Sequence, residues 1–220
     1  MAWSLGNDIK NQLVEIDGKT FEGPFMSREI IEKAVLPEKK QSELVLFALN
    51  KHTDAKEHLS FIQPLLEGKN VGLMSEAGCP GVADPGAVIV KLAHEKGIQV
   101  IPLVGPSSIL LAMMASGMNG QSFTFNGYLP IDKSDKKSAL KNLEKLSFDK
   151  NQSQIFIETP YRNNKLLEDI LQALQPSTHL CIATDITLPT EYIKTLRASD
   201  WKKTKVDLHN RPTIFIIHKF

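Results

Sequence analysis

Residues 71–86 read Val71-Gly-Leu-Met-Ser-Glu-Ala-Gly-Cys-Pro-Gly-Val-Ala-Asp-Pro-Gly86. The stretch opens with a short apolar run, continues into a loop rich in Gly and Pro, and leads into an apolar segment that begins at Ala87. The loop fits neither a helix nor a strand, because Gly admits positive φ angles and Pro removes a backbone donor. Ligands of open α/β sheets usually bind at loops that follow the carboxyl ends of strands. We therefore interpret residues 71–86 as a strand, a small-molecule-binding loop and a helix start.

The flanking sequence alternates in the same way. Apolar runs of strand length occupy residues 44–49, 70–74 and 98–104. Between and after them the pattern predicts three helices: one capped by Thr53 or Asp54 and running to residue 67, one over residues 87–96 followed by Gly97, and one over residues 109–116 capped by Ser107 or Ser108. This alternation indicates a parallel sheet with crossover helices.

The first 40 residues give weaker signals. They predict a short helix over residues 8–16, turns at residues 17–18 and 23–24, and a helix over residues 28–34 that Ser27 caps. The fold class that we expect is α/β, with two α/β domains at residues 1–120 and 121–220.

The second domain combines strands and helices. The polar residues 131–138 are expected to be mobile, and Ser199 is expected to cap a short helix. Closely spaced strands near the carboxyl end indicate a mixed sheet. The predicted strands are residues 123–129, 154–158, 179–185, 190–196 and 213–218, and the predicted helices are residues 139–146 and 163–174.

Composition is that of a soluble globular protein. Of the 220 residues, 42% are hydrophobic and 23% are charged, and no apolar run approaches the roughly 20 residues that span a bilayer. The amino-terminal residues lack the pattern of a secretory signal, and the cysteines, Cys79 and Cys181, suit a reducing compartment. We expect a cytoplasmic protein. Residues 121–220 carry 15 Lys+Arg against 11 Asp+Glu, which suits a nucleic-acid surface and equally well suits solvated helix faces.

Several kinds of chemistry find no support in the sequence. The phosphate-binding glycine motifs are absent, and the six histidines show no metal-ligand spacing, so we expect no metal. Cys79 has no evident activating partner. Two loops, residues 75–86 and 105–108, follow adjacent predicted strands and can together hold a ligand of adenosine size; the alternative is a pair of ordinary strand–helix turns.

Four segments resemble the tetrapyrrole methylase family. They are residues 75–86, Pro102-Leu-Val-Gly-Pro-Ser-Ser108, Phe125-Asn-Gly-Tyr-Leu-Pro130 and Ile157-Glu-Thr-Pro-Tyr-Arg162. The sequence is most similar to the branch of small-subunit ribosomal RNA 2′-O-ribose methyltransferases. The resemblance implies two α/β domains, S-adenosylmethionine held in a cleft between them, a homodimer, and ribosomal RNA or the small ribosomal subunit as partner.

The resemblance also implies roles for individual residues. Glu158 and Arg162 are the candidate catalytic residues, with a helix-capping ion pair as the alternative. Lys133, Lys136 and Lys137 are candidates for phosphate contacts, and Tyr128 for stacking on a nucleotide or for a structural role. The candidate cofactor-binding residues are Glu76, Gly78, Cys79, Val82, Ala83, Ser107, Ser108, Ala183, Thr184, Pro212 and Thr213.

The sequence departs from the family pattern at two places. Residues 4–9 resemble the end of the family's first loop, yet no apolar strand precedes them, so we expect the first strand to be missing. The segment Asn210-Arg-Pro-Thr213 replaces an acidic family string. Three functions therefore stay open: a methyltransferase acting on a cytidine ribose of small-subunit (16S) ribosomal RNA, a methylase of a small tetrapyrrole-like substrate, and a cofactor-binding protein without turnover.

Overall fold

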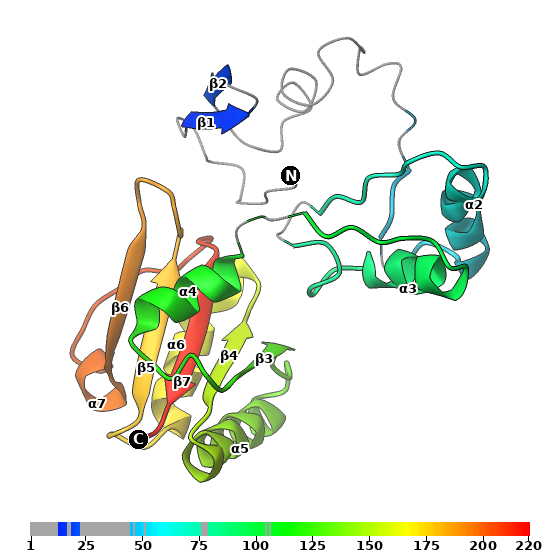
Figure 1. Ribbon diagram of the computed structural model, residues 1–220. Coiled ribbons are helices and arrows are strands. Elements are labelled where there is room, and N and C mark those ends of the chain that lie inside the picture. The colour runs from blue at the N-terminus through cyan, green and yellow to red at the C-terminus, as the bar shows by residue number, and fades with distance from the viewer. Residues whose placement is uncertain are drawn as a thin grey trace. The chain divides into compact units, whose positions relative to one another are not determined.

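The computed structural model describes residues 13–16, 19–22, 45, 47–50, 52–75, 79–103, 105 and 107–220 (Figure 1). The chain divides into two compact units, Met1–Ser107 and Ser108–Phe220. Within the described part of the chain, no helix has the length and apolar character needed to cross a membrane.

The N-terminal unit contains a β-hairpin. Strand β1 (Leu13–Ile16) pairs antiparallel with β2 (Lys19–Glu22), with Leu13 opposite Glu22. The predicted helix over residues 8–16 is therefore wrong for its last four residues. Val14 and Ile16 are β-branched and favour an extended backbone, and β2 supplies the hydrogen-bonded partner. The predicted helix over residues 28–34, its cap and the family-like residues 4–9 lie outside the described residues.

Two helices of the N-terminal unit confirm their predictions. Helix α2 (Ala55–Leu66) begins after Asp54, whose carboxylate accepts a hydrogen bond from Lys56 N at 2.8 Å in a capping box with Glu57. Helix α3 (Ala87–Glu95) is followed by Gly97 at φ 67°, a conformation that Gly adopts without steric cost. Phe61 and Ile62 of α2 pack with Ile89 of α3 in a small core.

The three predicted strands of the N-terminal unit are wrong for the residues that the structure describes. Residues 45, 47–49, 70–74 and 98–103 belong to no hydrogen-bonded sheet among the described residues. Several of their apolar side chains are open to solvent, with Val45 79%, Ile101 67% and Leu103 70% exposed, whereas Leu49 and Ile98 pack against the small core. An apolar run forms a buried strand only when a second strand hydrogen-bonds to it. That second strand can lie far away in the sequence, so the run alone does not reveal it.

The C-terminal unit is built on a mixed five-stranded sheet of order β3-β4-β7-β5-β6. Strands β3 and β4 are parallel, whereas the pairs β4–β7, β7–β5 and β5–β6 are antiparallel, which confirms the predicted mixed sheet and the α/β class. The strands are β3 (Phe123–Tyr128), β4 (Ser153–Ile157), β5 (His179–Thr184), β6 (Tyr192–Arg197) and β7 (Thr213–His218).

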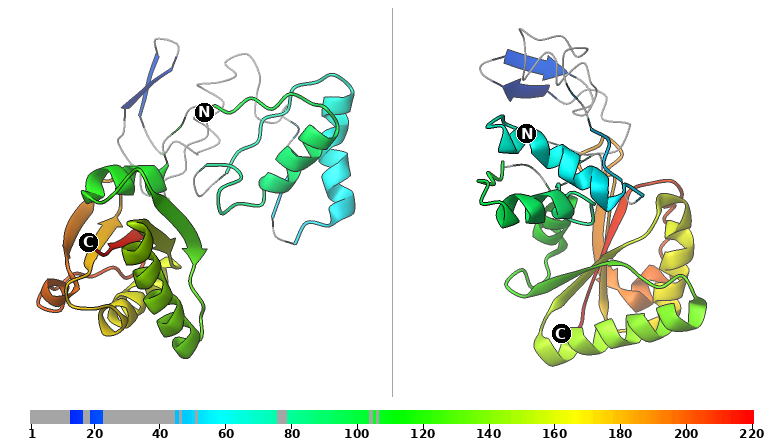
Figure 2. Two further views of the ribbon diagram at one scale, coloured as in Figure 1. Left: turned by 60° about the horizontal axis from the view of Figure 1, so that its bottom comes forward. Right: turned by 90° about the vertical axis from the view of Figure 1, so that its right-hand side faces the viewer.

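Helices cover both faces of this sheet (Figure 2). Helix α4 (Ser108–Ser116) lies on one face, where it packs with Cys181 and Ile216. The opposite face packs against α5 (Lys133–Lys150), α6 (Asn163–Ala173) and α7 (Ala198–Trp201) through the larger core. Because strand side chains alternate, neighbouring residues of β4 enter different cores.

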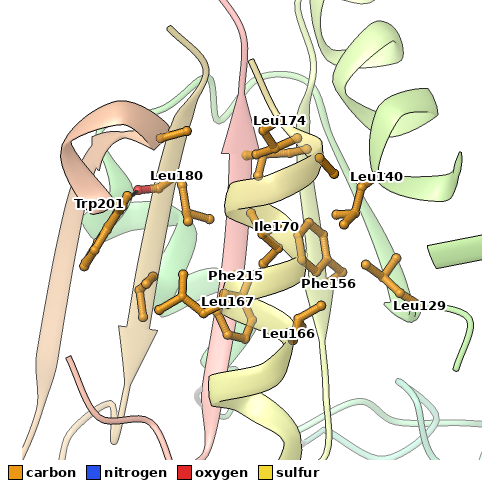
Figure 3. Close-up of a cluster of buried hydrophobic side chains, with 14 of the residues drawn as sticks. Leu129, Leu140, Phe156, Leu166, Leu167, Ile170, Leu174, Leu180, Trp201 and Phe215 are labelled. Carbon is orange, nitrogen blue, oxygen red and sulfur yellow. Dashed lines mark hydrogen bonds between the residues drawn. The ribbon is translucent and has the colours of Figure 1, made fainter. Parts of the chain in front are cut away.

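Figure 3 shows the larger core, with α6 lying across the sheet. Phe156 of β4 and Phe215 of β7 are register partners, and their stacked rings have centroids 6.0 Å apart. Trp201 fixes α7 to the sheet, because its buried indole Nε1 donates to the carbonyl oxygen of Leu180 at 2.8 Å.

Two expectations for the C-terminal half need correction. Residues 133–138 form the first turns of α5 rather than a mobile segment, because Asp132 caps that helix by accepting from Ser134 N at 2.8 Å and Asp135 N at 3.2 Å. Helix α7 begins one residue before Ser199, with Arg197 at the N-cap. Helix α4 belongs to the compact unit Ser108–Phe220, because it packs on the sheet of that unit.

Candidate functional site

One edge of the C-terminal sheet gathers both predicted catalytic residues and four of the predicted cofactor-binding residues. Strands β3, β4 and β5 end at this edge and β7 begins there, because β7 is antiparallel to both β4 and β5. Thr184 is paired with Thr213, and Ile157 and Ala183 are both paired with Ile214. We call this edge, with the residues that directly follow β3, β4 and β5 and precede β7, the carboxyl edge.

Glu158 and Arg162 form an ion pair at the carboxyl edge. Glu158 Oε1 accepts from Arg162 Nη2 at 2.8 Å and from Thr159 N at 2.7 Å, and Arg162 Nε donates to Thr159 Oγ1 at 2.9 Å. The short helix η2 (Pro160–Arg162) brings the two side chains together, since it turns the chain directly after β4. The Glu158 side chain is 3% exposed and that of Arg162 is 31% exposed. Within the described residues, Arg162 Nη1 has no hydrogen-bond acceptor.

Two exposed tyrosines lie at the same edge. Tyr161 is 61% exposed, and the Arg162 guanidinium carbon lies 5.4 Å from the centroid of its ring. Tyr128, 58% exposed, ends β3 after a register shift at Gly127, which has φ 63°. Asn126 supports this bulge by donating its side-chain amide to the carbonyl of Ile155 at 3.2 Å. The sequence prediction included Tyr128 but missed Tyr161, whose signal is an aromatic residue between Pro160 and Arg162.

The predicted cofactor residues of the C-terminal unit are largely buried against their own structure. Ala183 packs beneath α4, and Thr184 is fully buried. Thr184 Oγ1 donates to the carbonyl of Pro212 at 3.1 Å, and Thr213 Oγ1 donates to Thr184 Oγ1 at 2.9 Å. Among these four residues Pro212 is the exposed one. The hydroxyls of Thr184 and Thr213 therefore make hydrogen bonds within the protein. Of the four residues, Pro212 is the one whose side chain a ligand could reach.

A second ion pair supports the carboxyl edge and was missed from the sequence. Asp185 follows β5 with φ 51°, and its Oδ2 accepts from Arg211 Nε and from Thr190 Oγ1, both at 2.8 Å. Arg211 Nη2 also donates to the carbonyl of Thr190 at 2.7 Å. These contacts fix the loop that leads into β7, and so they position Pro212. The usable signal was an acid at the end of the predicted strand 179–185 and an Arg two residues before the predicted strand 213–218.

The loop of residues 79–86 in the N-terminal unit is held by Asp84. Its Oδ1 accepts from Gly81 N at 3.2 Å and from Gly86 N at 2.8 Å. A Cβ added at Gly86 would lie 2.7 Å from Asp84 Oδ1 and 2.9 Å from Leu73 Cδ2, so a side chain there would displace the carboxylate that holds the loop. The loop presents Val82, 47% exposed, and the exposed Ala83 at φ 53°. A rigid loop with a small apolar face fits the adenosyl part of a nucleoside cofactor.

The remaining predicted cofactor residues are placed as follows. Cys79 and Ser107 are half-buried in the N-terminal unit, and Ser108 is the first residue of α4 in the C-terminal unit. Glu76 and Gly78 lie outside the described residues. Among the residues that the structure describes, no group of three or more His, Cys, Asp or Glu side chains has an arrangement that would hold a metal ion.

Comparison with known protein families gives one clear match. The family model described as Tetrapyrrole (Corrin/Porphyrin) Methylases matches residues 19–201. Three curated relatives carry the name Ribosomal RNA small subunit methyltransferase I. That of Buchnera aphidicola subsp. Schizaphis graminum is 33% identical over 79% of this chain and 60% of its own length. Those of Vibrio cholerae and Escherichia coli O157:H7 are 33% and 34% identical, each over 67% of this chain and 50% of its own length. The matched region thus spans about half of these two relatives.

Solved structures of low sequence identity share the fold. Diphthine synthase matches with a TM-score of 0.57 at 15% identity, over 77% of this chain and 67% of that chain. The methyltransferase CobJ matches with a TM-score of 0.55 at 16% identity, over 80% of this chain and 75% of that chain. At such identities the likeness concerns the fold alone.

Proposed function

This chain belongs to the tetrapyrrole methylase family, and on that premise we propose that it is an S-adenosylmethionine-dependent methyltransferase that modifies a cytidine 2′-hydroxyl in small-subunit (16S) ribosomal RNA. The observation that carries the proposal is the identity of 33–34% to three relatives named as small-subunit ribosomal RNA methyltransferases. The chain covers 50–60% of their lengths, so their activity is assigned to it here as a proposal.

The loop of residues 79–86 is one proposed contact of the cofactor. In support, Asp84 holds the loop of residues 79–86 rigid with Val82 and Ala83 on its surface. S-adenosylmethionine supplies an electrophilic methyl group on a sulfonium. The residues that we propose for its binding are Glu76, Gly78, Cys79, Val82, Ala83, Ser107, Ser108, Ala183, Thr184, Pro212 and Thr213.

Arg162 is the proposed catalytic residue at the acceptor, and Glu158 orients it. A ribose hydroxyl is a weak nucleophile, and a nearby cation stabilises the negative charge that develops on its oxygen. Glu158 and Thr159 fix Nη2 and Nε of the guanidinium, while the side chain remains partly open to solvent. The carboxylate of Glu158 is itself almost fully buried, which suits orientation better than direct contact with an RNA.

An RNA substrate suits the surface of the carboxyl edge. Tyr128 and Tyr161 expose aromatic rings there, and unpaired bases commonly stack on such rings. A small tetrapyrrole would need a more enclosed site. We further propose a cytoplasmic homodimer, as the family resemblance implies. A content of two cysteines, Cys79 and Cys181, suits a reducing compartment.

Transfer of a tritiated methyl group from S-adenosylmethionine tests the proposal. Three acceptors are compared: small ribosomal subunits lacking the modification, free small-subunit ribosomal RNA, and a uroporphyrinogen-type tetrapyrrole. We expect label in the ribosomal RNA, recovered in an alkali-resistant dinucleotide, because a 2′-O-methyl group blocks cleavage of the adjacent phosphodiester.

Other outcomes separate the two alternatives. Label in the tetrapyrrole alone would identify a methylase of small substrates. Cofactor binding by calorimetry without transfer to any acceptor would identify a binding protein without turnover. Either result would contradict the proposed function.

A further inference from the structure

A groove lined by basic side chains lies in the C-terminal unit between α5 and the end of α6. Its volume is about 630 Å³. Lys137, Lys141 and Lys145 of α5 line it together with Lys219, which follows β7. Phe148, 59% exposed, adds an aromatic ring. The groove is separate from the carboxyl edge, because its walls come from the opposite ends of α6 and β7.

The positive charge of this groove is not neutralised within the described residues. None of the four lysines forms an ion pair with a described carboxylate. Lys219 Nζ donates to Gln175 Oε1 at 2.5 Å and lies 5.6 Å from the Phe148 ring centroid. The lining includes one acid, Glu144, but its carboxylate is buried and accepts from Gln175 N at 2.8 Å and from the Thr178 hydroxyl. The Glu144 carboxylate therefore makes its hydrogen bonds within the protein and forms no ion pair with the groove lysines.

The lysines continue as a row along α5 toward the carboxyl edge. Lys133, Lys137, Lys141 and Lys145 recur every four residues, so each neighbours the next in a row that winds gradually around the helix. Lys133 starts α5 shortly after Tyr128, and Lys145 lies about 18 Å further along the helix axis at 1.5 Å per residue. Like charges at this spacing repel each other, so a bound polyanion would relieve an unfavourable feature of the free protein.

We infer that the lysine row and the groove bind the phosphate backbone of the RNA substrate, with Phe148 stacking on an unpaired base. The inference rests on the proposed function and adds a second contact region to it. Ammonium groups along a track with an exposed aromatic ring are the usual means of binding single-stranded RNA. Lys136 is not part of this surface, because it is buried in an ion pair with Asp169 at 3.3 Å.

Fluorescence anisotropy of a labelled single-stranded fragment of small-subunit ribosomal RNA tests the inference with the full chain. The groove variant combines Lys137→Gln, Lys141→Gln and Lys145→Gln. The control variant combines Lys202→Gln, Lys203→Gln and Lys205→Gln, which removes the same charge from exposed lysines outside the groove lining.

The two variants are expected to behave differently. Three lost phosphate contacts predict binding about a hundredfold weaker near 0.1 M salt, and a slope of log K against log salt that is smaller by about two. The control should stay within about twofold of the wild type. Phe148→Ala should weaken binding about tenfold and leave the salt slope unchanged, because stacking is not ionic.

The outcomes distinguish this inference from the proposed function. Unchanged S-adenosylmethionine binding by calorimetry establishes that each variant is folded. If the groove variant binds RNA as the wild type does, the groove has no role in RNA binding even where methyl transfer proceeds. If RNA binding depends on the groove while no acceptor is methylated, the inference stands and the proposed function fails. Equal displacement of the RNA by polyglutamate would identify a general surface for acidic proteins and overturn the inference.

Discussion

At the scale of single residues, the guanidinium of Arg162 is partly hydrogen-bonded within the protein and partly exposed to solvent. Two of its nitrogens are bound by Glu158 and Thr159, and the side chain keeps 31% of its surface exposed. Such an arrangement aims a positive charge without leaving it mobile, which is what stabilisation of a developing oxyanion requires.

Substitution of Arg162 tests this role. Arg162→Ala should lower kcat for methyl transfer about a hundredfold, a typical loss for one stabilising donor, and leave the affinity for S-adenosylmethionine unchanged. Arg162→Lys keeps the charge but loses the planar arrangement of donors. Its kcat should therefore lie between the kcat of the wild type and that of Arg162→Ala. A kcat for Arg162→Ala within twofold of the wild type would assign the ion pair to helix capping alone.

Asp185 stabilises the carboxyl edge through a pair that is partly buried. Its side chain is 8% exposed and that of Arg211 is 28% exposed. Asp185→Ala should lower the free energy of unfolding by about 2 kcal/mol, since charge-assisted hydrogen bonds contribute roughly that much. Asp185→Asn should lose less, because Asn also tolerates the left-handed conformation. Urea unfolding measures both, and equal stabilities of all three proteins would contradict this account of the loop.

His218 makes stability depend on pH at the other end of the sheet. It is fully buried, its Nδ1 lies 3.2 Å from Ser153 Oγ, and its Nε2 has no hydrogen-bond partner among the described residues. Burial, and then the neighbouring His179, hold the pKa of His218 below its ordinary value of 6.5. His218 therefore binds a proton less readily in the folded state than in the unfolded state. Its contribution to stability is complete above pH 6.5 and declines as the pH falls below that value.

Melting temperatures measured across this range check the effect of His218. The wild type should lose stability as the pH is lowered from about 7 to about 5. His218→Gln removes the titrating group and should show a shallower decline, although it is less stable at neutral pH. Parallel curves for the two proteins would show that other groups cause the acid sensitivity.

At the scale of elements, α5 shows how one cap extends a helix. The carboxylate of Asp132 accepts from the Ser134 hydroxyl at 2.7 Å and from the backbone N–H groups of Asp135 and Ser134. These bonds, the one from the hydroxyl above all, hold the pKa of Asp132 below its usual value. Asp132→Ala should lower Tm by a few degrees and loosen the first turn. Asp149→Ala, near the carboxyl end of the same helix, is the matched control and should leave Tm unchanged or raise it, because an acid there opposes the helix dipole. Equal losses in both variants would argue against the cap.

Sequence reasoning succeeded where structure is encoded locally. The cap at Asp54 and the stop at Gly97 each depend on neighbours within a few residues, and both are present. Strand prediction at residues 70–74 and 98–103 failed because a ladder depends on a distant partner. The first turns of α5 were missed because residues 131–138 are polar on all sides, so their hydrophobic pattern carries no signal.

The candidate site was predictable in part for the same reason. Glu158 and Arg162 are four residues apart, so their pairing is readable from the sequence. The link between Asp185 and Arg211 crosses 26 residues, and only the pairing of β5 with β7 brings them together. Likewise, the groove along α5 depends on Lys219 arriving at the end of β7, which no local pattern indicates.

At the scale of the whole molecule, the chain divides into two compact units, Met1–Ser107 and Ser108–Phe220. The C-terminal unit contains the larger core and the carboxyl edge, whose position follows from the strand order. The N-terminal unit contributes the loop held by Asp84. The central claim is that backbone at both places, rather than a reactive side chain, holds the cofactor.

Amide hydrogen exchange of the full chain, with and without S-adenosylmethionine, tests that claim most directly. If the backbone holds the cofactor at these places, its addition slows amide exchange in residues 79–86 and in residues 183–185 and 211–213. Asp84→Ala should abolish the change in residues 79–86, because the loop loses the carboxylate that orders it. Exchange that stays the same at both places at saturating cofactor, or that slows only elsewhere in the chain, would contradict the account.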